Sequence, residues 1–491
     1  MSASRFTRRS ALRSSALLLL AGAGGSILSA CAATPAAPTA APAAPTKAPA
    51  AAATAAPTAK PAASGQAKTI QWFTPAEIGL ERDFYTKFAN DFMTENPSIK
   101  VEASFEGWND YMTKLPTVFA GGAIPDANHL HVSLVQDYGS RGAMRNMFEY
   151  MDRDKVSRDL YFKPLVFQFS DYKSHTKLWA VPKDSATYAI YYNKDLFDKA
   201  GVPYPKDDWS FQEFRNAAKM LTVDKAGNRS DSAKFDKGQI AQWGFTWIDP
   251  LPSGDSQNQL AWAWFGNWYN DDFTKAFYDT PESIEYLQFF ADMRCKDRSI
   301  PTAGDALGQG DPFRNQITAM QIGHHSMVFF YNAEKKTFKF DSAFSPTGKG
   351  GSWSAVACSG HGVASKAKNP DEGWMLVKYL TSEAKQCEIV SAKRWGSATV
   401  ACEKNLLPTD KNPASFEKAL VLPLYKAQGM PAETKTEAKG MIFPPFHNDI
   451  KQIFVTEFDA VANCGDVTAA QAVKKIQPQV QALLDKAAKG S

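Results

Sequence analysis

Histidines in two close pairs are the first residues of this 491-residue chain whose types and spacing could do chemistry. Four of its seven histidines form the pairs His129/His131 and His324/His325. An imidazole can exchange hydrogen bonds with the hydroxyl or carboxylate groups of a solute, or it can bind a metal ion such as zinc. The same residues can instead cap helices or stand on surface loops, and the two rings of a His-x-His pair on an extended strand point in opposite directions. The sequence leaves all three interpretations open.

Motifs of enzyme catalysis are missing from the sequence. It contains no HExxH, GxSxG, P-loop or GxGxxG pattern. The segment Ser382–Lys385 fits SxxK but has no companion motif, so we interpret it as a chance match. We therefore expect a protein that is not an enzyme and that needs no cofactor.

The first 66 residues have the composition of an export signal and a tether. Residues 1–30 combine four arginines, no acidic residue and the apolar run 16–23, which is too short to span a membrane and is typical of a signal peptide. The segment 7–13 resembles a twin-arginine export motif, and the segment 28–31 (Leu-Ser-Ala-Cys) matches a bacterial lipobox. By that resemblance Cys31 is lipidated and anchors the protein to the cell membrane on its extracytoplasmic side. Residues 31–66 are almost wholly Ala, Pro, Thr and Ser, which predicts an extended tether.

Charge and composition describe the rest of the chain. The net charge of +4 comes from the four N-terminal arginines, and without them basic and acidic residues balance at 51 each. A neutral body lacks the basic surface that nucleic-acid binding requires, so no nucleic-acid partner is expected. The length of the chain, together with 44% hydrophobic and 22% charged residues, predicts a soluble body of two lobes. We also expect the protein to be a monomer.

Alternating strand and helix patterns predict an α/β fold. A strand over 68–74 is followed by a helix over 81–95, where phenylalanines recur every four residues, and by a strand over 99–105. A strand, helix, strand unit of this kind implies a parallel sheet. Further helices are predicted over 110–120, 210–221, 281–293, 370–380 and 468–488. Pro478 should bend or break the last of these.

Several stretches of the body also occur in a recognisable order. They are 96–101, 108–115, 120–126, 178–182, 191–197 (Tyr-Tyr-Asn-Lys-Asp-Leu-Phe), 200–202, 209–214, 319–323, 359–364 and 369–382. In this order they resemble the family 1 extracellular solute-binding proteins of bacterial ABC importers, which include maltose-binding protein. The resemblance implies a two-lobed periplasmic-binding-protein-like fold (type II) with crossing hinge strands and an interlobe ligand cleft. It places the N-terminal lobe at 68–182 plus 343–384 and the C-terminal lobe at 183–342 plus 385–491.

The resemblance also implies a function. Proteins of this group capture a carbohydrate, either a mono- or an oligosaccharide, by closing their lobes, and they deliver it to the transmembrane subunits of an ABC permease. A sugar presents a flat face to an aromatic ring and hydroxyl groups to polar side chains around its edge. His129 and His131 stand where the family places ligand contacts. In maltose-binding protein Trp and Asp occupy these places, so maltose specificity is not expected to transfer.

Thirteen residues on or near the expected cleft combine these properties. In Glu77 a carboxylate follows the first strand and could bridge two hydroxyl groups, and in His361 an imidazole stands in a glycine-rich approach. The predicted substrate-binding residues are Glu77, Trp108, His129, His131, Tyr188, Trp243, Trp247, Trp264, His324, His325, Trp353, His361 and Trp395.

Two other functions remain open at this point. One is the capture of a non-sugar solute or a metal ion through His129, His131, His324 and His325. The other is a secreted carbohydrate-active enzyme with two carboxylates about 5–10 Å apart. The five cysteines after Cys31 are an odd number, and a disulfide between Cys387 and Cys402 is one option that the spacing allows.

Overall fold

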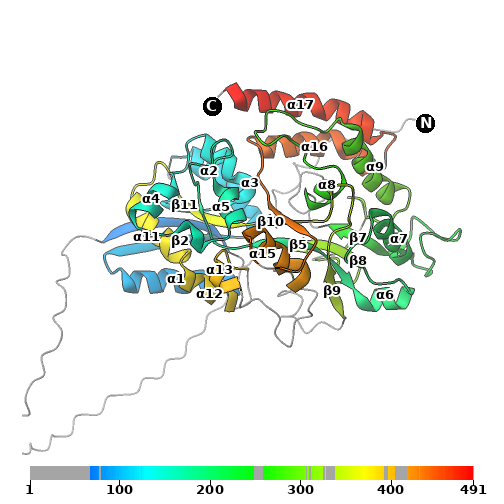
Figure 1. The fold of residues 1–491 in the computed structure, drawn as a ribbon, viewed down its shortest axis with the longest axis horizontal. Helices are drawn as coiled ribbons and strands as arrows, with labels where there is room; N and C mark the ends of the chain where they lie inside the picture. The colour runs from blue at the N-terminus through cyan, green and yellow to red at the C-terminus, as the bar shows by residue number, and fades with distance from the viewer. Residues whose placement is uncertain are drawn as a thin grey trace, which may run out of the picture. The chain divides into compact units, whose positions relative to one another are not determined.

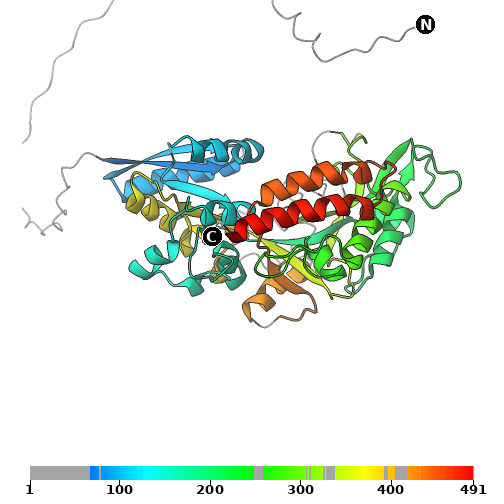
Figure 2. The ribbon, with the colours of Figure 1, turned by 90° about the horizontal axis from the view of Figure 1, so that it is seen from above.

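Two β-sheets with helices packed against them carry the fold of the body (Figures 1 and 2). The computed structural model describes residues 67–76, 79–122, 124–247, 258–305, 307–308, 311–324, 327, 338–391, 396–403, 417–430 and 432–489. The predicted signal peptide, tether and lipidation site at Cys31 lie outside these residues. None of the helices in the described part is both long enough and apolar enough to cross a membrane.

The first sheet has the strand order β2-β1-β3-β11-β4. Its strands are β1 (Lys68–Pro75), β2 (Ile99–Glu106), β3 (Ala127–His131), β4 (Val181–Pro182) and β11 (Ser359–Val363). Strand β1 runs parallel to β2 and to β3, and the helix α1 (Leu80–Glu95) connects β1 to β2, which confirms the predicted parallel unit. We call this sheet and the helices packed on its core the first lobe. The helices are α1, α2 (Trp108–Ala120), α3 (Val132–Ser140), α4 (Met147–Arg153), the short 3₁₀ helix Arg158–Leu160, α5 (Lys163–Phe169), α11 (Pro370–Leu380), α12 (Glu383–Ser391), α13 (Val400–Glu403) and α15 (Leu422–Gln428), which follows a π-helical turn at Glu417–Val421.

The second sheet has the order β12-β10-β5-β8-β7-β6, with β9 paired to β5. Its strands are β5 (Ala186–Asn193), β6 (Val223–Asp224), β7 (Ile240–Trp247), β8 (Thr318–His324), β9 (Phe340–Ala343), β10 (Trp353–Ala357) and β12 (Glu437–Gly440). We call this sheet and its helices the second lobe. The helices are α6 (Lys194–Ala200), α7 (Phe211–Leu221), α8 (Asn258–Trp264), α9 (Pro281–Cys295), α16 (His447–Ala462) and α17 (Ala469–Lys489), the last two lying side by side (Figures 1 and 2).

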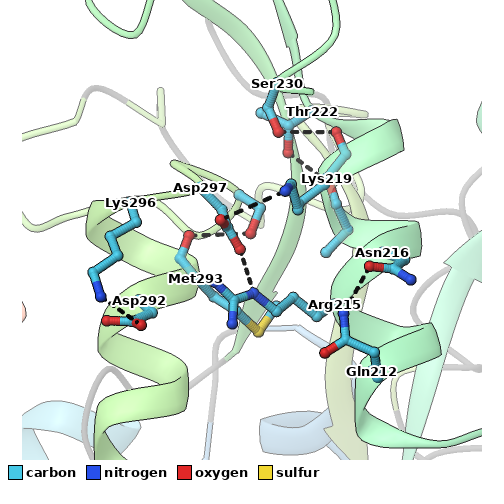
Figure 3. A network of polar contacts seen from close by, with 12 residues as sticks. Gln212, Arg215, Asn216, Lys219, Thr222, Ser230, Asp292, Met293, Lys296 and Asp297 are labelled. Atoms are coloured by element: carbon cyan, nitrogen blue, oxygen red, sulfur yellow. Dashed lines mark hydrogen bonds and ion pairs between the residues drawn. The ribbon is translucent and has the colours of Figure 1, made fainter. Parts of the chain in front are cut away.

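Polar contacts fasten α7 to the end of α9 inside the second lobe (Figure 3). Arg215 of α7 donates to the carboxylate of Asp297 at 2.5 Å, and Lys219 lies 3.8 Å from the same carboxylate. Asp297 is buried, so two cations on one helix neutralise a charge that would otherwise be costly to bury. Helix α7 itself begins at a capping box formed by Ser210 and Glu213.

The chain crosses between the two sheets at very short segments. Residues 183–185 connect β4 to β5, and Cys358 alone separates β10 from β11. Lys183 and Asp184 form a buried ion pair at 2.6 Å, and Asp184 also accepts a hydrogen bond of 2.6 Å from the backbone N–H of Ser359. One carboxylate therefore ties the first crossing segment to the second.

A small apolar cluster lies at these crossings. It is formed by Val132, Tyr188, Trp262, Ala355, Ala357, Met441 and Phe443, which come from both lobes. Burial of such side chains stabilises the fold by roughly 1.5–3 kcal/mol each. The cluster thus gives the crossings a core of their own.

The chain passes between the two lobes more often than the family resemblance implied, so parts of two assigned segments belong to the other lobe. Within the segment 343–384, assigned to the N-terminal lobe, β10 pairs with β5 and β12 of the second sheet. Within the segment 385–491, assigned to the C-terminal lobe, Leu424 packs in the core of the first lobe and Phe454 in that of the second. The difference arises because the chain crosses once more between α15 and β12.

Helix α17 runs unbroken through Pro478, so the predicted break is wrong. Val473, Ile476, Val480 and Leu484 of this helix are buried in the core of the second lobe. The Gln477 side chain accepts a hydrogen bond from Tyr278 N and donates one to Ala276 O. Packing on both sides of the proline outweighs the roughly 3 kcal/mol that proline costs inside a helix.

Two disulfides connect helices within the lobes. The Cys387–Cys402 disulfide, the option that the sequence left open, joins α12 to α13, and Cys295–Cys464 joins α9 to the turn after α16. Cys358 at the second crossing is buried and unpaired. Structural disulfides are typical of proteins that fold outside the cytoplasm.

Asp184→Asn should lower the free energy of unfolding by about 3 kcal/mol, because it leaves the Lys183 ammonium buried without its counter-charge. Chemical denaturation of residues 67–491 measures the change. The control is Asp231→Asn, which breaks an exposed ion pair with Arg229 and should cost less than about 1 kcal/mol. Equal costs for the two variants would contradict the structural role of the buried pair.

Candidate functional site

Four of the predicted residues come together at the carboxyl end of β3. The ring centroid of Trp108 lies 5.2 Å from that of His131 and 6.1 Å from that of His129. The rings of His129 and His361, which face each other across β3 and β11, are 5.9 Å apart. Sequence reasoning thus selected residues that are neighbours in space.

The side chains of these four residues differ in how far they are exposed. The side chains of His129 and His361 are 2% and 1% exposed, so they pack inside the first lobe and present no surface to a solute in this conformation. Burial, reinforced by the charge of Lys183, lowers the pKa of both imidazoles well below the usual value. His131 Nδ1 lies 2.8 Å from Ser133 Oγ and caps α3, which matches the structural interpretation of this residue. Trp108 is 37% exposed and stands at the surface.

The remaining described candidates belong to the second lobe. Tyr188 and His324 pair across β5 and β8, with their rings 5.8 Å apart. Trp243 is buried in β7, and Trp264 is partly buried and packs against Phe211 at the edge of the core. Trp353 lies edge-on to Trp262 at 6.0 Å. Glu77, His325 and Trp395 lie outside the described residues, as does the side chain of Trp247.

A pocket that both lobes line lies elsewhere. It has a volume of about 590 Å³, and none of the predicted residues whose side chains the structure describes lines it. Its walls come from the end of α5 and the loop after it, from the start of α8, from the loop 267–278 and from the segment 439–447. The lining residues are Phe167, Tyr172, Lys173, His175, Asn258, Trp262, Asn267–Phe273, Tyr278, Lys439–Pro444 and His447.

The wall from the first lobe is an aromatic platform. Phe167 is 43% exposed at the end of α5, and its ring stacks at a tilt on His175 with centroids 4.2 Å apart. The loop that carries His175 is held by Asp171, whose carboxylate accepts hydrogen bonds from Ser174 N and Lys177 N. An apolar ring held open to the pocket is the kind of group that stacks on a flat solute.

The wall from the second lobe is a loop braced by aromatic stacking. Trp268 stacks on Tyr278 with centroids 5.0 Å apart, and the Tyr278 hydroxyl lies 2.7 Å from that of Tyr269. Phe273 on the same loop meets Tyr172 of the first lobe edge-on at 5.3 Å. The two walls therefore touch at one side of the pocket.

The floor between the walls is the segment that follows β12. His447 packs against Phe443 at 4.3 Å and is buried. Burial lowers its pKa to about 3, and the charges of Lys451 and His131 act in the same direction. The predicted residue His131 therefore lies close enough to influence the pocket although it does not line it.

Polar groups at the pocket surface complete the site. Asn258, Asn267 and Asp271 offer amide and carboxylate groups, and Lys439 offers an ammonium group. A concave surface with aromatic walls and a few polar side chains suits a polar solute with flat faces. A second, shallower hollow of about 390 Å³ adjoins it and shares Asn267, Tyr269, Asn270 and Asp271.

Metal binding finds no geometric support in the part of the chain that the structure describes. No three His, Cys, Asp or Glu side chains there are grouped so that they could hold an ion. His325, one member of the proposed cluster, lies outside this part.

One signal in the sequence could have revealed the pocket. The segment 267–273 reads Asn-Trp-Tyr-Asn-Asp-Asp-Phe and so concentrates aromatic, amide and acidic side chains in seven residues. This is the mixture expected for carbohydrate recognition. Phe167 gave no comparable signal, because an exposed phenylalanine at a helix end looks like a core residue in the sequence.

Comparisons with known proteins agree with this architecture. A family model of bacterial extracellular solute-binding proteins matches residues 79–386. A binding protein of Brucella abortus is 22% identical over 305 residues, which cover 60% of this chain and 68% of that protein. The melibiose/raffinose/stachyose-binding protein MelE of Bacillus subtilis is 26% identical over 200 residues, or 39% of this chain and 44% of MelE.

Solved structures show the same fold. An ABC substrate-binding protein from Listeria monocytogenes in complex with cycloalternan has a TM-score of 0.69 and 23% identity, and the match covers 85% of this chain and 99% of that one. The expected two-lobed α/β fold is thereby confirmed.

The lowered pKa of His447 predicts a loss of stability in acid. The unfolded chain binds a proton at this imidazole near the ordinary value of about 6.5, whereas the folded chain does so only near 3. Between pH 6 and pH 4 the free energy of unfolding should therefore fall by about 1.4 kcal/mol per pH unit more steeply in the wild type than in His447→Asn. Denaturation at a series of pH values measures both slopes. Above pH 7 the two curves should run parallel, and parallel curves throughout would contradict burial of a neutral imidazole.

Proposed function

Because the chain belongs to the family of bacterial extracellular solute-binding proteins, we propose that it captures a carbohydrate in the pocket between its lobes for an ABC importer. The permease would receive the closed, loaded form. Membership of a family of binding proteins agrees with the expectation that the chain is not an enzyme. Bound sugar, on this proposal, leaves the protein chemically unchanged.

The observation that carries the proposal is the composition of the pocket walls. Aromatic side chains line the pocket from both lobes, the exposed Phe167 from the first and the half-buried Tyr269 from the second, and amide and carboxylate groups lie between them. Sugar rings stack on such surfaces while their hydroxyl groups exchange hydrogen bonds around the edge. The volume of about 590 Å³ lies within the usual range for small-molecule sites.

Backbone strain around the pocket supports the same assignment. His175 and Phe273, which line it, have φ angles of +54° and +53°, and Phe446 at the start of α16 has +62°. Left-handed conformations cost non-glycine residues free energy and persist where the surrounding structure enforces them, often at ligand-binding sites. Three such residues around one pocket favour a binding role for it.

Lobe closure would follow from the two-sided construction of the pocket. A ligand that contacts Phe167 and Tyr269 at the same time favours the conformation in which both are near. The shift toward that conformation is limited by the difference between the affinities of the closed and open forms. Short crossing segments provide hinges for this movement.

The ligands named for similar proteins support the carbohydrate class. MelE is named for melibiose, raffinose and stachyose, and the Listeria protein was solved with cycloalternan. The predicted contacts Trp108, Tyr188, His324 and Trp353 remain proposals for further parts of the cleft. A thermal-shift screen with mono- and oligosaccharides, sugar acids, zinc and a chelator tests the class, since a ligand at 100 times its dissociation constant should stabilise the fold by about 2.7 kcal/mol.

We also propose that Cys31 carries the lipid that holds the protein at the outer face of the cell membrane. The lipobox at 28–31 and the tether of residues 31–66 support this anchor. The disulfides Cys295–Cys464 and Cys387–Cys402 agree with an extracytoplasmic location.

Phe167→Ala should weaken sugar binding about tenfold, which corresponds to about 1.4 kcal/mol, because it removes an exposed stacking surface. Isothermal titration with a sugar that scores in the screen measures the change. Met375→Ala removes a similarly exposed apolar side chain on α11, outside the pocket, and should leave the affinity as it is. The same affinity in all three proteins would remove Phe167 from the site.

Cys31→Ser should release the full-length protein from the membrane fraction, because no acyl chain can then be attached. Fractionation of cells that express each form, together with labelling by a radioactive fatty acid, measures the effect. The neighbouring substitution Ala33→Ser leaves the lipobox intact and serves as the control. Retention of Cys31→Ser in the membrane would contradict the anchor.

A further inference from the structure

Two lysines line the pocket from opposite lobes. Lys439 on β12 is partly buried, and its Nζ donates to Asn267 Oδ1 at 3.2 Å while lying 5.4 Å from the centroid of the Trp262 ring. Lys173 on the loop after α5 is exposed, with Nζ 5.8 Å from the Tyr172 ring. Neither ammonium forms an ion pair with a residue in the described part of the chain.

The acidic residues of the pocket lining, Asp271 and Asp272, form no ion pair with these lysines in the described part of the chain. Asp272 turns back onto its own loop, where its carboxylate accepts hydrogen bonds from Thr274 N and Thr274 Oγ1. Asp271 is then the one lining carboxylate without such a bond among the described residues, and it influences Lys439 only through the electrostatic field. The two lysines and the two aspartates of the lining balance in formal charge, but neither lysine has a carboxylate in direct contact among the described residues.

The surroundings of Lys439 make its positive charge unfavourable in the absence of a counter-ion. An ammonium carries three hydrogen-bond donors, and one of those of Lys439 donates to Asn267. Burial lowers the pKa of Lys439, and Asp271 opposes this only in part. A partly buried cation without a counter-ion becomes more favourable once an anion binds beside it.

We infer that the carbohydrate is anionic and that Lys439 receives its carboxylate or phosphate group. This inference rests on the proposed function, because it names the class of sugar that the same pocket takes. The second ammonium, on Lys173, approaches from the other lobe. An anion between the two lysines attracts both lobes and so adds to the preference for the closed form. Lys439 is thus the residue that decides specificity.

The experiment compares matched sugars on the same protein. Isothermal titration of residues 67–491 uses trigalacturonate, its carboxyl-reduced neutral counterpart and glucose 6-phosphate, each at low and high salt. Trigalacturonate should bind at least about tenfold more tightly than its neutral counterpart, and glucose 6-phosphate tests whether a phosphate can replace the carboxylate. High salt should weaken the anionic ligands selectively, because it screens the ammonium groups.

The variants locate the effect. Lys439→Met should weaken the preferred anionic sugar at least about tenfold and leave the neutral one unchanged. Lys475→Met removes the same charge from an exposed position on α17 and should change neither. Tight binding of the neutral trisaccharide alone, or an unchanged anion affinity in Lys439→Met, overturns the inference and leaves the proposed function standing. If no carbohydrate binds in this experiment or in the wider screen, both are overturned.

Discussion

The hydrogen bonds and the ion pair at the crossing segments are the constraint on which the rest of the structure depends. Asp184 accepts a hydrogen bond from Ser359 N, and the Lys183 backbone N–H donates to Ser359 O at 2.8 Å, so two crossings are joined edge to edge. Lys183 neutralises the carboxylate that makes this link. Both groups are buried, and the pair is favourable there only because their charges and donors are matched. Any movement of one sheet against the other has to bend around this fixed point.

The geometry of the pocket depends on these linked crossing segments. Phe167 belongs to the first lobe and Trp268 to the second, while Phe443 stands in the segment that follows the third crossing and packs with the apolar cluster of the crossings. No single lobe contains the three. The floor is rigid because His447 packs on Phe443, and the first turn of α16 is held to the first lobe by Asp137, which accepts from Phe446 N at 2.5 Å. The binding of a ligand on this floor therefore depends on the relative position of the two lobes.

Sequence patterns predicted the helices and strands that short stretches of sequence specify. They failed where contacts between residues far apart in the sequence determine the structure. Helix α1 and the strands on either side of it follow from periodicity over about forty residues. The helix does not break at Pro478, because Gln477 and the buried face of α17 contact parts of the chain about 200 residues away. The pocket was missed for the same reason. Trp264 and Trp268 lie four residues apart in the sequence and both pack with the core of the second lobe, yet only Trp268 also lines the pocket, and no local pattern separates the two.

Lys183, which is buried, and Lys439, which is partly buried, show that a lysine side chain can stabilise the fold or act in the pocket. Burial alone would lower the pKa of Lys183, but Asp184 and Tyr85 raise it above the usual value, so its charge is fully compensated within the chain. Burial lowers the pKa of Lys439, and no carboxylate contacts it in the described structure. A compensated charge fixes a conformation, because moving either partner exposes the other to an apolar environment. An uncompensated charge leaves part of its interaction free energy unrealised until a partner arrives. Lys183 lies at the hinge, where a fixed conformation is needed. Lys439 lies in the pocket, where a charge has to remain available for a ligand.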